Sequence, residues 1–140
     1  MNLKLNKNQI ERFSRQIILK NIGTLGQKKI IQSKVLIIGM GGLGCPVAEF
    51  LTRAGVGSIG IIDSDDVDLS NIHRQSLYDT NDIKKAKVHA AKKKLNKINS
   101  ETKVNCYKIR LDNKNFTKIL KLSKKSLKKL MISLIIKFLK

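Results

Sequence analysis

Two stretches of the sequence decide the fold: residues 35–44 read VLIIGMGGLG, and residues 59–75 read IGIIDSDDVDLSNIHRQ. The first opens with a continuous apolar run, typical of a central parallel strand, and continues into a glycine-rich turn. The second is another apolar run that ends in acids and leads into a polar loop. A strand, a glycine turn, a helix, a second strand and an acid follow one another in this order in a nucleotide-binding βαβ unit.

The glycines of the turn predict a phosphate site. Gly39 permits the tight turn, and Gly41 lets the backbone approach a phosphate with no side chain between them. Gly42 and Gly44 allow the next helix, predicted at about 43–54, to pack closely on the sheet. The N-terminus of that helix directs its free N–H groups and its positive dipole end at a bound anion.

Asp63 follows the second apolar run, at the position where a carboxylate would bind a ribose hydroxyl. A glycine-rich turn alone is weak support for a nucleotide site, because many turns use glycine for steric reasons only. The flanking strand, the helix and an acid at this spacing together favour the nucleotide site.

Five matches in one order carry a family resemblance: RFSRQI at 12–17, GMGGLG at 39–44, DSD at 63–65, SNIHRQ at 70–75, and Lys87. From about residue 11 to about residue 99, and more weakly to about 120, the chain resembles the N-terminal part of the ThiF/MoeB/HesA adenylyltransferases, relatives of ubiquitin-activating enzymes. The resemblance implies a homodimer with an α/β fold, a Rossmann-like doubly wound and mainly parallel sheet, that binds ATP with Mg²⁺. It implies adenylation of the C-terminal glycine carboxylate of a ubiquitin-like sulfur-carrier protein, as in thiamine or molybdopterin synthesis.

The resemblance also assigns site residues. Asp63 would bind the ribose, and Arg15 would reach the partner subunit's ATP. The triphosphate would contact Asn71, Arg74 and Lys87. The glycines of the turn would face the phosphates: Gly39, Gly41, Gly42 and Gly44. A carboxylate that attacks the α-phosphorus of ATP brings two anions together, so charge stabilisation dominates catalysis. Arginine supplies a bidentate fork and lysine a point charge, so we predict Arg74, Lys87 and Arg15 as catalytic.

Simpler interpretations of these residues stay open. Lys87 is one of 24 lysines, and Arg15 in isolation would be a surface residue of a helix. His73 fits a structural or exposed position better than a catalytic one, because no carboxylate or cysteine pattern recruits it. The acids at 65–68 either cap the loop by turn chemistry or approach magnesium.

The net charge of +19 invites a nucleic-acid function, but its distribution argues against one. Residues 34–83 hold three basic and seven acidic side chains, whereas residues 84–140 hold nineteen basic and two acidic ones. The excess is therefore outside the motifs, and it consists of lysine with few arginines and aromatics to stack on bases. We expect neither a specific nucleic-acid partner nor a membrane partner, and Lys, Asn and Ile enrichment from an AT-rich genome explains the charge.

The remaining elements follow from capping and periodicity. We expect a helix from a capping pair at Asn8 and Glu11 to about 20, a helix at 27–32, a helix at 83–98, a strand at 103–109 and a helix at 115–122. In the helix at 83–98, Val88, Ala91, Leu95 and Ile98 recur at helical spacing and are predicted to face the sheet.

The length fits one domain, divided into an N-terminal helical segment at 1–33, an incomplete nucleotide-binding domain at 34–122 and a basic, apolar tail at 123–140. Two cysteines, Cys45 and Cys106, make no disulfide framework and no CxxC pair, so we expect a cytoplasmic protein with no zinc site within this chain. No signal peptide is apparent, and the apolar stretch at 130–139 is too short to span a bilayer.

The tail departs from the family pattern, which implies a further apolar strand ending in Asp and an Asp-Asn pair beside the strand at 35–38. No acid follows Asp112, and residues 130–136 read LMISLII. We therefore expect a sheet truncated after about the third strand, with residues 130–136 as a substitute strand. A frameshift that replaces the catalytic half would explain the tail, and a natural early stop is the alternative.

Three functions remain open at this stage. The first is an ATP-dependent adenylyltransferase for a ubiquitin-like carrier, and the second is an NAD- or FAD-binding oxidoreductase with the same glycine turn. The third is a nucleotide-binding remnant that has lost its chemistry. The polar loop at 70–75 favours a triphosphate, and no residue pattern supplies a hydride-transfer site.

Overall fold

The computed structural model describes residues 4–112, 115 and 133–134 of the chain. Its elements run, in order, α1 (Lys7–Arg12), α2 (Ser14–Ile17), α3 (Gly23–Gln32), β1 (Lys34–Ile38), α4 (Gly44–Ala54), β2 (Ser58–Ile62), α5 (Leu69–Ile72), the 3₁₀ helix η1 (Thr80–Asp82), α6 (Lys87–Ile98), β3 (Lys103–Tyr107) and β4 (Ser133–Leu134).

The strands form one parallel sheet in the order β3-β2-β1-β4. Val35 of β1 lies opposite Ile59 of β2, which lies opposite Val104 of β3. All five residues of β2 are buried, as expected of an apolar central strand. The predicted Rossmann-like α/β architecture is confirmed, and Ser133–Leu134 lies on the free side of β1, where a substitute strand was expected.

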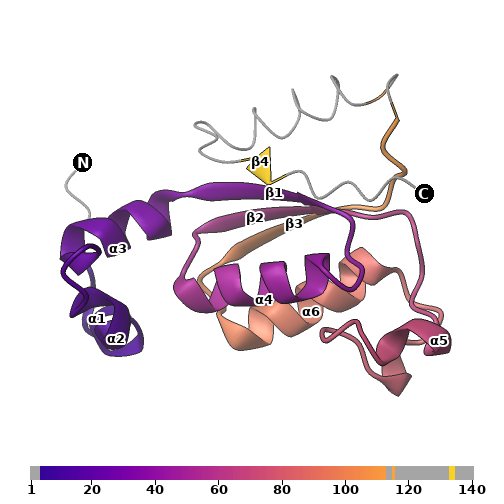
Figure 1. Ribbon diagram of the computed structural model, residues 1–140, viewed down its shortest axis with the longest axis horizontal. Helices are drawn as coiled ribbons and strands as arrows, with labels where there is room; N and C mark the ends of the chain where they lie inside the picture. The colour runs from indigo at the N-terminus through magenta and orange to yellow at the C-terminus, as the bar shows by residue number, and fades with distance from the viewer. Residues whose placement is uncertain (1–3, 113–114, 116–132, 135–140) are drawn as a thin grey trace.

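Helices α4 and α6 lie side by side on one face of the sheet (Figure 1). The predicted inner face of α6 is confirmed, because Val88, Ala91 and Leu95 are fully buried and Ile98 packs against the same cluster. Removing a valine, leucine or isoleucine side chain from water contributes roughly 1.5–3 kcal/mol, and removing the alanine methyl contributes less. The burial of α4 and α6 therefore fixes the loops that join them to the strands.

The predicted N-terminal helix is wrong in its start and its continuity. The capping box is formed by Asn6 and Gln9, with the Gln9 amide N–H donating to Asn6 Oδ1 at 2.9 Å, so the helix starts before Asn8. The helix stops at Phe13, whose side chain is only 1% exposed, because the chain turns there to bury the ring. Helix α3 starts at Gly23, four residues before the predicted start at residue 27.

The predicted start of α6 at residue 83 is also wrong. Residues on either side of Ala86 pair instead with the loop after β2: the Val67 N–H donates to Lys85 O at 2.8 Å, and the Lys84 N–H to Val67 O at 2.9 Å. Lys84 takes a left-handed backbone with φ 64°, so helix geometry begins only at Lys87. Strand β3 ends two residues before the predicted end, and the helix predicted at 115–122 lies outside the described residues, apart from residue 115.

Three side chains of α1 and its C-cap contact the turns at the far end of the sheet: Gln9, Arg12 and Phe13, which we call the N-terminal clasp. Gln9 Nε2 donates to Glu101 Oε2 at 2.8 Å, and Arg12 Nη1 donates to the Ile98 carbonyl at 3.0 Å. The Phe13 ring covers the backbone between α4 and β2. In the part of the chain that the structure describes, no helix is long and apolar enough to cross a membrane.

Gly55 is the residue that admits the Phe13 ring. It ends α4 with φ 90°, in the left-handed region, and a Cβ atom at this position would lie 2.5 Å from Phe13 Cζ. Only glycine satisfies both conditions without strain, because it has no Cβ and tolerates positive φ.

Candidate functional site

The glycine turn between β1 and α4 closes so tightly that it excludes side chains. A Cβ atom on Gly44 would lie 1.8 Å from the Gly39 carbonyl oxygen, well inside any allowed contact. The Gly39 N–H donates to the Ile62 carbonyl at 2.8 Å, and the Cys45 N–H donates to the Gly41 carbonyl at 3.0 Å. The turn is thus tied to β2 on one side and to the first turn of α4 on the other.

The Asp63 carboxylate holds the turn and the following loop together. Its Oδ2 accepts from the Met40 N–H at 2.6 Å, and its Oδ1 accepts from the Asp65 N–H at 2.8 Å. The sequence predicts Asp63 as a ribose ligand, and the structure adds this structural role. A carboxylate has about four lone-pair sites, so two amide donors leave acceptor capacity for a hydroxyl group.

Two buried side chains hold the other side of the turn, and the sequence analysis missed both. The Tyr78 hydroxyl donates to the Met40 carbonyl at 2.9 Å, and the Cys45 thiol donates to the same carbonyl at 3.3 Å. Burial is the main cause that raises the pKa of both Tyr78 and Cys45, so both side chains stay protonated donors at neutral pH. The only sequence signal was an aromatic residue close after the polar loop.

The polar loop lies against the glycine turn. A Cβ on Gly42 would lie 3.3 Å from the Arg74 carbonyl oxygen and 3.6 Å from Arg74 Cγ, so the loop backbone and the arginine stem pack on this glycine. Asn71 lies in α5, whose N-cap Asp68 accepts from the Ser70 N–H at 2.7 Å. Turn chemistry therefore accounts for Asp68, one of the acids for which magnesium was the alternative.

Lys87 is nearly buried and is paired with an acid. Its Nζ lies 3.2 Å from Asp65 Oδ2, with 7% of the lysine side chain and 67% of the aspartate side chain exposed. Partial burial raises the pKa of Asp65, but the hydrogen bond and charge of Lys87 outweigh it, and the net pKa is lowered. Since Asp65 also binds Asp63 through its amide, a chain of contacts links Lys87 to the glycine turn.

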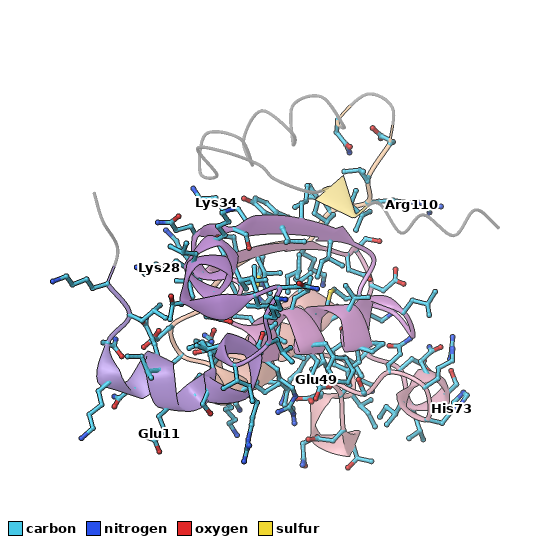
Figure 2. The ribbon with its side chains drawn as sticks, turned by 60° about the vertical axis from the view of Figure 1, so that its left-hand side comes forward. Glu11, Lys28, Lys34, Glu49, His73 and Arg110 are labelled. Carbon is cyan, nitrogen blue, oxygen red and sulfur yellow. The ribbon has the colours of Figure 1, made fainter. Side chains whose placement is uncertain are left out.

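Arg15 is not part of this cluster. It lies exposed on α2, beside the N-terminal clasp, and Figure 1 shows α2 and α5 at opposite ends of the molecule. Figure 2 shows the same separation between Glu11 of α1 and the outward-pointing His73 after α5. The structure thus gathers the glycine turn, Asp63, Arg74 and Lys87, and leaves Arg15 apart.

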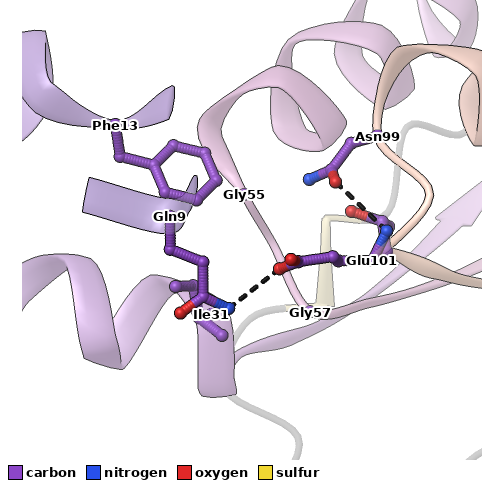
Figure 3. Close-up of a pocket in the computed structure, with 8 residues that line it drawn as sticks. Gln9, Phe13, Ile31, Gly55, Gly57, Asn99 and Glu101 are labelled. Carbon is purple, nitrogen blue, oxygen red and sulfur yellow. Dashed lines mark hydrogen bonds between the residues drawn. The ribbon is translucent and has the colours of Figure 1, made fainter. Parts of the chain in front are cut away.

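A hollow of about 230 Å³ lies at the ends of the strands opposite the glycine turn (Figure 3). Its polar side chains already have protein partners: Asn99 Nδ2 donates to the Thr52 carbonyl at 3.3 Å, and Thr102 Oγ1 to the Val56 carbonyl at 2.9 Å. Gln9 and Glu101 bind each other across it. These satisfied groups suit the joint of the N-terminal clasp better than a ligand site.

A protein-family model and several curated proteins match most of this chain in sequence. The sequence model of the ThiF family matches residues 13–131. The chain is 46% identical over 117 residues to the adenylyltransferase and sulfurtransferase MOCS3 of Culex quinquefasciatus, covering 84% of this chain and 27% of that protein. It is 39% identical over 119 residues to the sulfur carrier protein adenylyltransferase of Thermus thermophilus, covering 85% of this chain and 44% of that protein.

Solved structures show the same fold. The crystal structure of PaaA matches with a TM-score of 0.77 at 34% identity, over 88% of this chain and 40% of PaaA. The Escherichia coli tRNA N6-threonylcarbamoyladenosine dehydratase TcdA, solved in complex with ATP, matches with a TM-score of 0.79 at 24% identity, over 86% of this chain and 49% of TcdA. The chain thus spans between about a quarter and a half of the length of these relatives.

Proposed function

Because this chain belongs to the ThiF family, we propose that it forms the nucleotide-binding part of an ATP-dependent adenylyltransferase for a ubiquitin-like sulfur-carrier protein. The observation that carries the proposal is the nearly buried Lys87 in one cluster with the glycine turn. The buried ammonium group of Lys87 and an arginine whose aliphatic stem packs on Gly42 together suit a polyphosphate. Asp63 alone, as a ribose ligand, is weaker support for a dinucleotide. The similarity to proteins that are named as adenylyltransferases supports the same class of substrates, ATP and a carrier protein.

In the proposed reaction, a carboxylate oxygen of the carrier's C-terminal glycine attacks the α-phosphorus of ATP. The bond from that phosphorus to the bridging oxygen breaks, and the products are an acyl adenylate and pyrophosphate. Arg74 and Lys87 would neutralise the charge that grows on the phosphate oxygens. The loss of one such donor typically costs about 3 kcal/mol of transition-state stabilisation, a hundredfold or more in rate.

Magnesium in this proposal is held mainly by the phosphates of ATP, as is usual for this ion. Among residues 4–112, 115 and 133–134, no three His, Cys, Asp or Glu side chains gather as a metal site. We propose Asp65 for one remaining ligand position, because 67% of its side chain is exposed and it lies next to Lys87, the predicted triphosphate ligand. Both cysteines of the chain are free thiols, which suits the cytoplasm that we propose as the location.

Arg15 enters the proposal through a second copy of the chain. Its position at the far end of the molecule from α5 suits an arginine that reaches a neighbour's ATP, as the family resemblance implies. A mixture of Arg15→Ala and Lys87→Ala chains would then recover part of the activity, because some hybrid sites would contain both wild-type residues. A mixture no more active than its components would contradict the exchange.

Calorimetric titration with Mg-ATP and with NAD tests the nucleotide choice. We expect ATP to bind more tightly, and Arg74→Ala or Lys87→Ala to weaken ATP binding by roughly tenfold or more, the loss of one charged hydrogen bond. Lys93→Ala is the matched control, because Lys93 is exposed on the same helix as Lys87. Equal or tighter binding of NAD would contradict the adenylation proposal.

Exchange of labelled pyrophosphate into ATP tests the transfer step. We expect exchange only when a ubiquitin-like carrier protein with a C-terminal glycine is present. ATP binding without any exchange would instead support the alternative of a nucleotide-binding protein without transfer chemistry.

A further inference from the structure

The peptide bond between Met40 and Gly41 lies in the glycine turn, and two buried side chains hold its carbonyl oxygen. The Tyr78 hydroxyl donates to this oxygen at 2.9 Å, and the Cys45 thiol donates to it at 3.3 Å. Met40 and Cys45 are fully buried, and Tyr78 is 5% exposed. Because the carbonyl is shielded from water, these two donors take the place that water would have at an exposed turn.

The orientation of this peptide decides where the Gly41 N–H points. In a trans peptide the carbonyl oxygen and the N–H lie in one plane and point in opposite directions. The Gly41 N–H therefore points away from Tyr78 and Cys45, and it has no acceptor among the described residues. The turn thus presents an unpaired amide donor at the position where the sequence predicts a phosphate.

The residues on either side of the peptide bond do not fix its orientation by themselves. A rotation of this peptide changes ψ of Met40 and φ of Gly41, and glycine accepts φ of either sign at little cost. Type I and type II turns differ by such a rotation, and the second type favours glycine at the residue that follows the peptide. A rotated peptide would direct the carbonyl oxygen at the phosphate and leave the two buried donors unpaired, so the hydrogen bonds from Tyr78 and Cys45 oppose the rotation.

We infer that Tyr78, together with Cys45, is a positioning residue for the nucleotide: by holding the Met40 carbonyl, it keeps the Gly41 N–H directed at a phosphate oxygen. This inference rests on the proposed function and extends it to side chains that do not touch the nucleotide. Asp63 holds the preceding peptide instead, because its Oδ2 accepts from the Met40 N–H at 2.6 Å. Loss of the Tyr78 hydroxyl is therefore expected to weaken the phosphate contact and to leave the predicted ribose ligand in place.

Tyr78→Phe tests the inference, because phenylalanine keeps the ring in the core and removes only the hydroxyl donor. The control is Tyr107→Phe, the same change at the other tyrosine of the chain, which is half-buried on β3. Binding of Mg-ATP and of adenosine is measured by calorimetry. We expect Tyr78→Phe to bind ATP roughly three- to tenfold more weakly, the loss of one hydrogen bond, and to bind adenosine as the wild type does. Tyr107→Phe is expected to bind both as the wild type does.

The amide resonance of Gly41 in isotope-labelled protein gives a readout that a merely structural role would not change. At saturating Mg-ATP we expect a downfield proton shift of this amide in the wild type and a clearly smaller shift in Tyr78→Phe. The amide of Gly57, which lines the hollow at the other end of the sheet, is the reference. Cys45→Ser and Cys45→Ala form a second matched pair: only serine keeps a donor for the Met40 carbonyl, so Cys45→Ser is expected to bind ATP more tightly than Cys45→Ala.

Three results would overturn the inference while the proposed function stands, in a wild-type chain that binds ATP. The first is unchanged ATP affinity in Tyr78→Phe. The second is an equal loss of ATP and adenosine binding with the wild-type shift of the Gly41 amide, which would show a structural role only. The third is equal ATP affinity of Cys45→Ser and Cys45→Ala, which carries the test if Tyr78→Phe does not fold. A wild-type chain that does not bind ATP would overturn the proposed function, and this inference with it.

Discussion

The contact between Gly55 and the Phe13 ring predicts an energetic coupling that a double-mutant cycle can measure. Gly55→Ala introduces a Cβ that would lie 2.5 Å from Phe13 Cζ and 2.8 Å from Phe13 Cε1. Phe13→Leu removes both of those ring atoms and leaves an apolar side chain in the same place. The two changes are therefore expected to depend on each other strongly.

Two contributions make up the expected cost of Gly55→Ala. A left-handed backbone, φ 90° here, costs an L-residue about 1–2 kcal/mol. Overpacking against the ring adds about 1–3 kcal/mol. The sum is about 2–5 kcal/mol in the wild type. In Phe13→Leu the backbone contribution of about 1–2 kcal/mol remains, together with the contact of the new Cβ with Gln27 Nε2 at 3.1 Å, while the clash with the ring is lost.

Urea unfolding of the four chains gives the coupling directly from the free energies of unfolding. Gly23→Ala is the control, because Gly23 also has positive φ (57°) but no described atom beyond its chain neighbours and its own helix backbone lies within 4 Å of its Cβ position. Its cost is expected to be about 1–2 kcal/mol whether residue 13 is Phe or Leu. An equal cost of Gly55→Ala in both backgrounds would refute the contact between Gly55 and the ring.

Other predictions concern charge and burial. Asp65→Asn is expected to tighten ATP binding in EDTA severalfold, because it removes the acid that competes for Lys87; weaker binding by calorimetry would show that Asp65 positions the lysine instead. The hydrogen bond from Lys94 lowers the pKa of Asp79, so its stabilising contribution is present above the unfolded pKa of about 3.9 and is lost as the pH falls below it. Asp79→Asn is therefore expected to reduce the fall in unfolding free energy between pH 7 and pH 3, and an unchanged fall would contradict this role. Burial raises the pKa of the Cys45 thiol, so iodoacetamide at pH 8 is expected to label it much more slowly in the folded chain than in urea, as mass spectrometry would show; equal rates would contradict its burial.

Local patterns were sufficient where one face of an element meets the core. Strands β1 and β2 appear as apolar runs, and the inner face of α6 follows from Val88, Ala91 and Leu95 at helical spacing. The apolar side chains of these elements pack against other apolar side chains in one core cluster, so their spacing in the sequence is enough to identify them.

Long-range contacts explain where the sequence failed. The helix break at Phe13 depends on Gly55, more than forty residues away, and the late start of α6 depends on pairing between residues 84–86 and the loop after β2. No local propensity contains this information, because the competing partner is distant in the chain.

The N-terminal clasp also sets an order of events during synthesis. Gln9 bonds a residue 92 positions later, and Arg12 bonds one 86 positions later. At about 5–20 residues per second, the ribosome needs roughly 5–20 s to make that length of chain. Helix α1 has 6 residues, far below the roughly 12–15 that an isolated helix needs in water. Helix α1 is therefore made before its partners, and it stays exposed to chaperones and proteases until the turn after α6 has emerged.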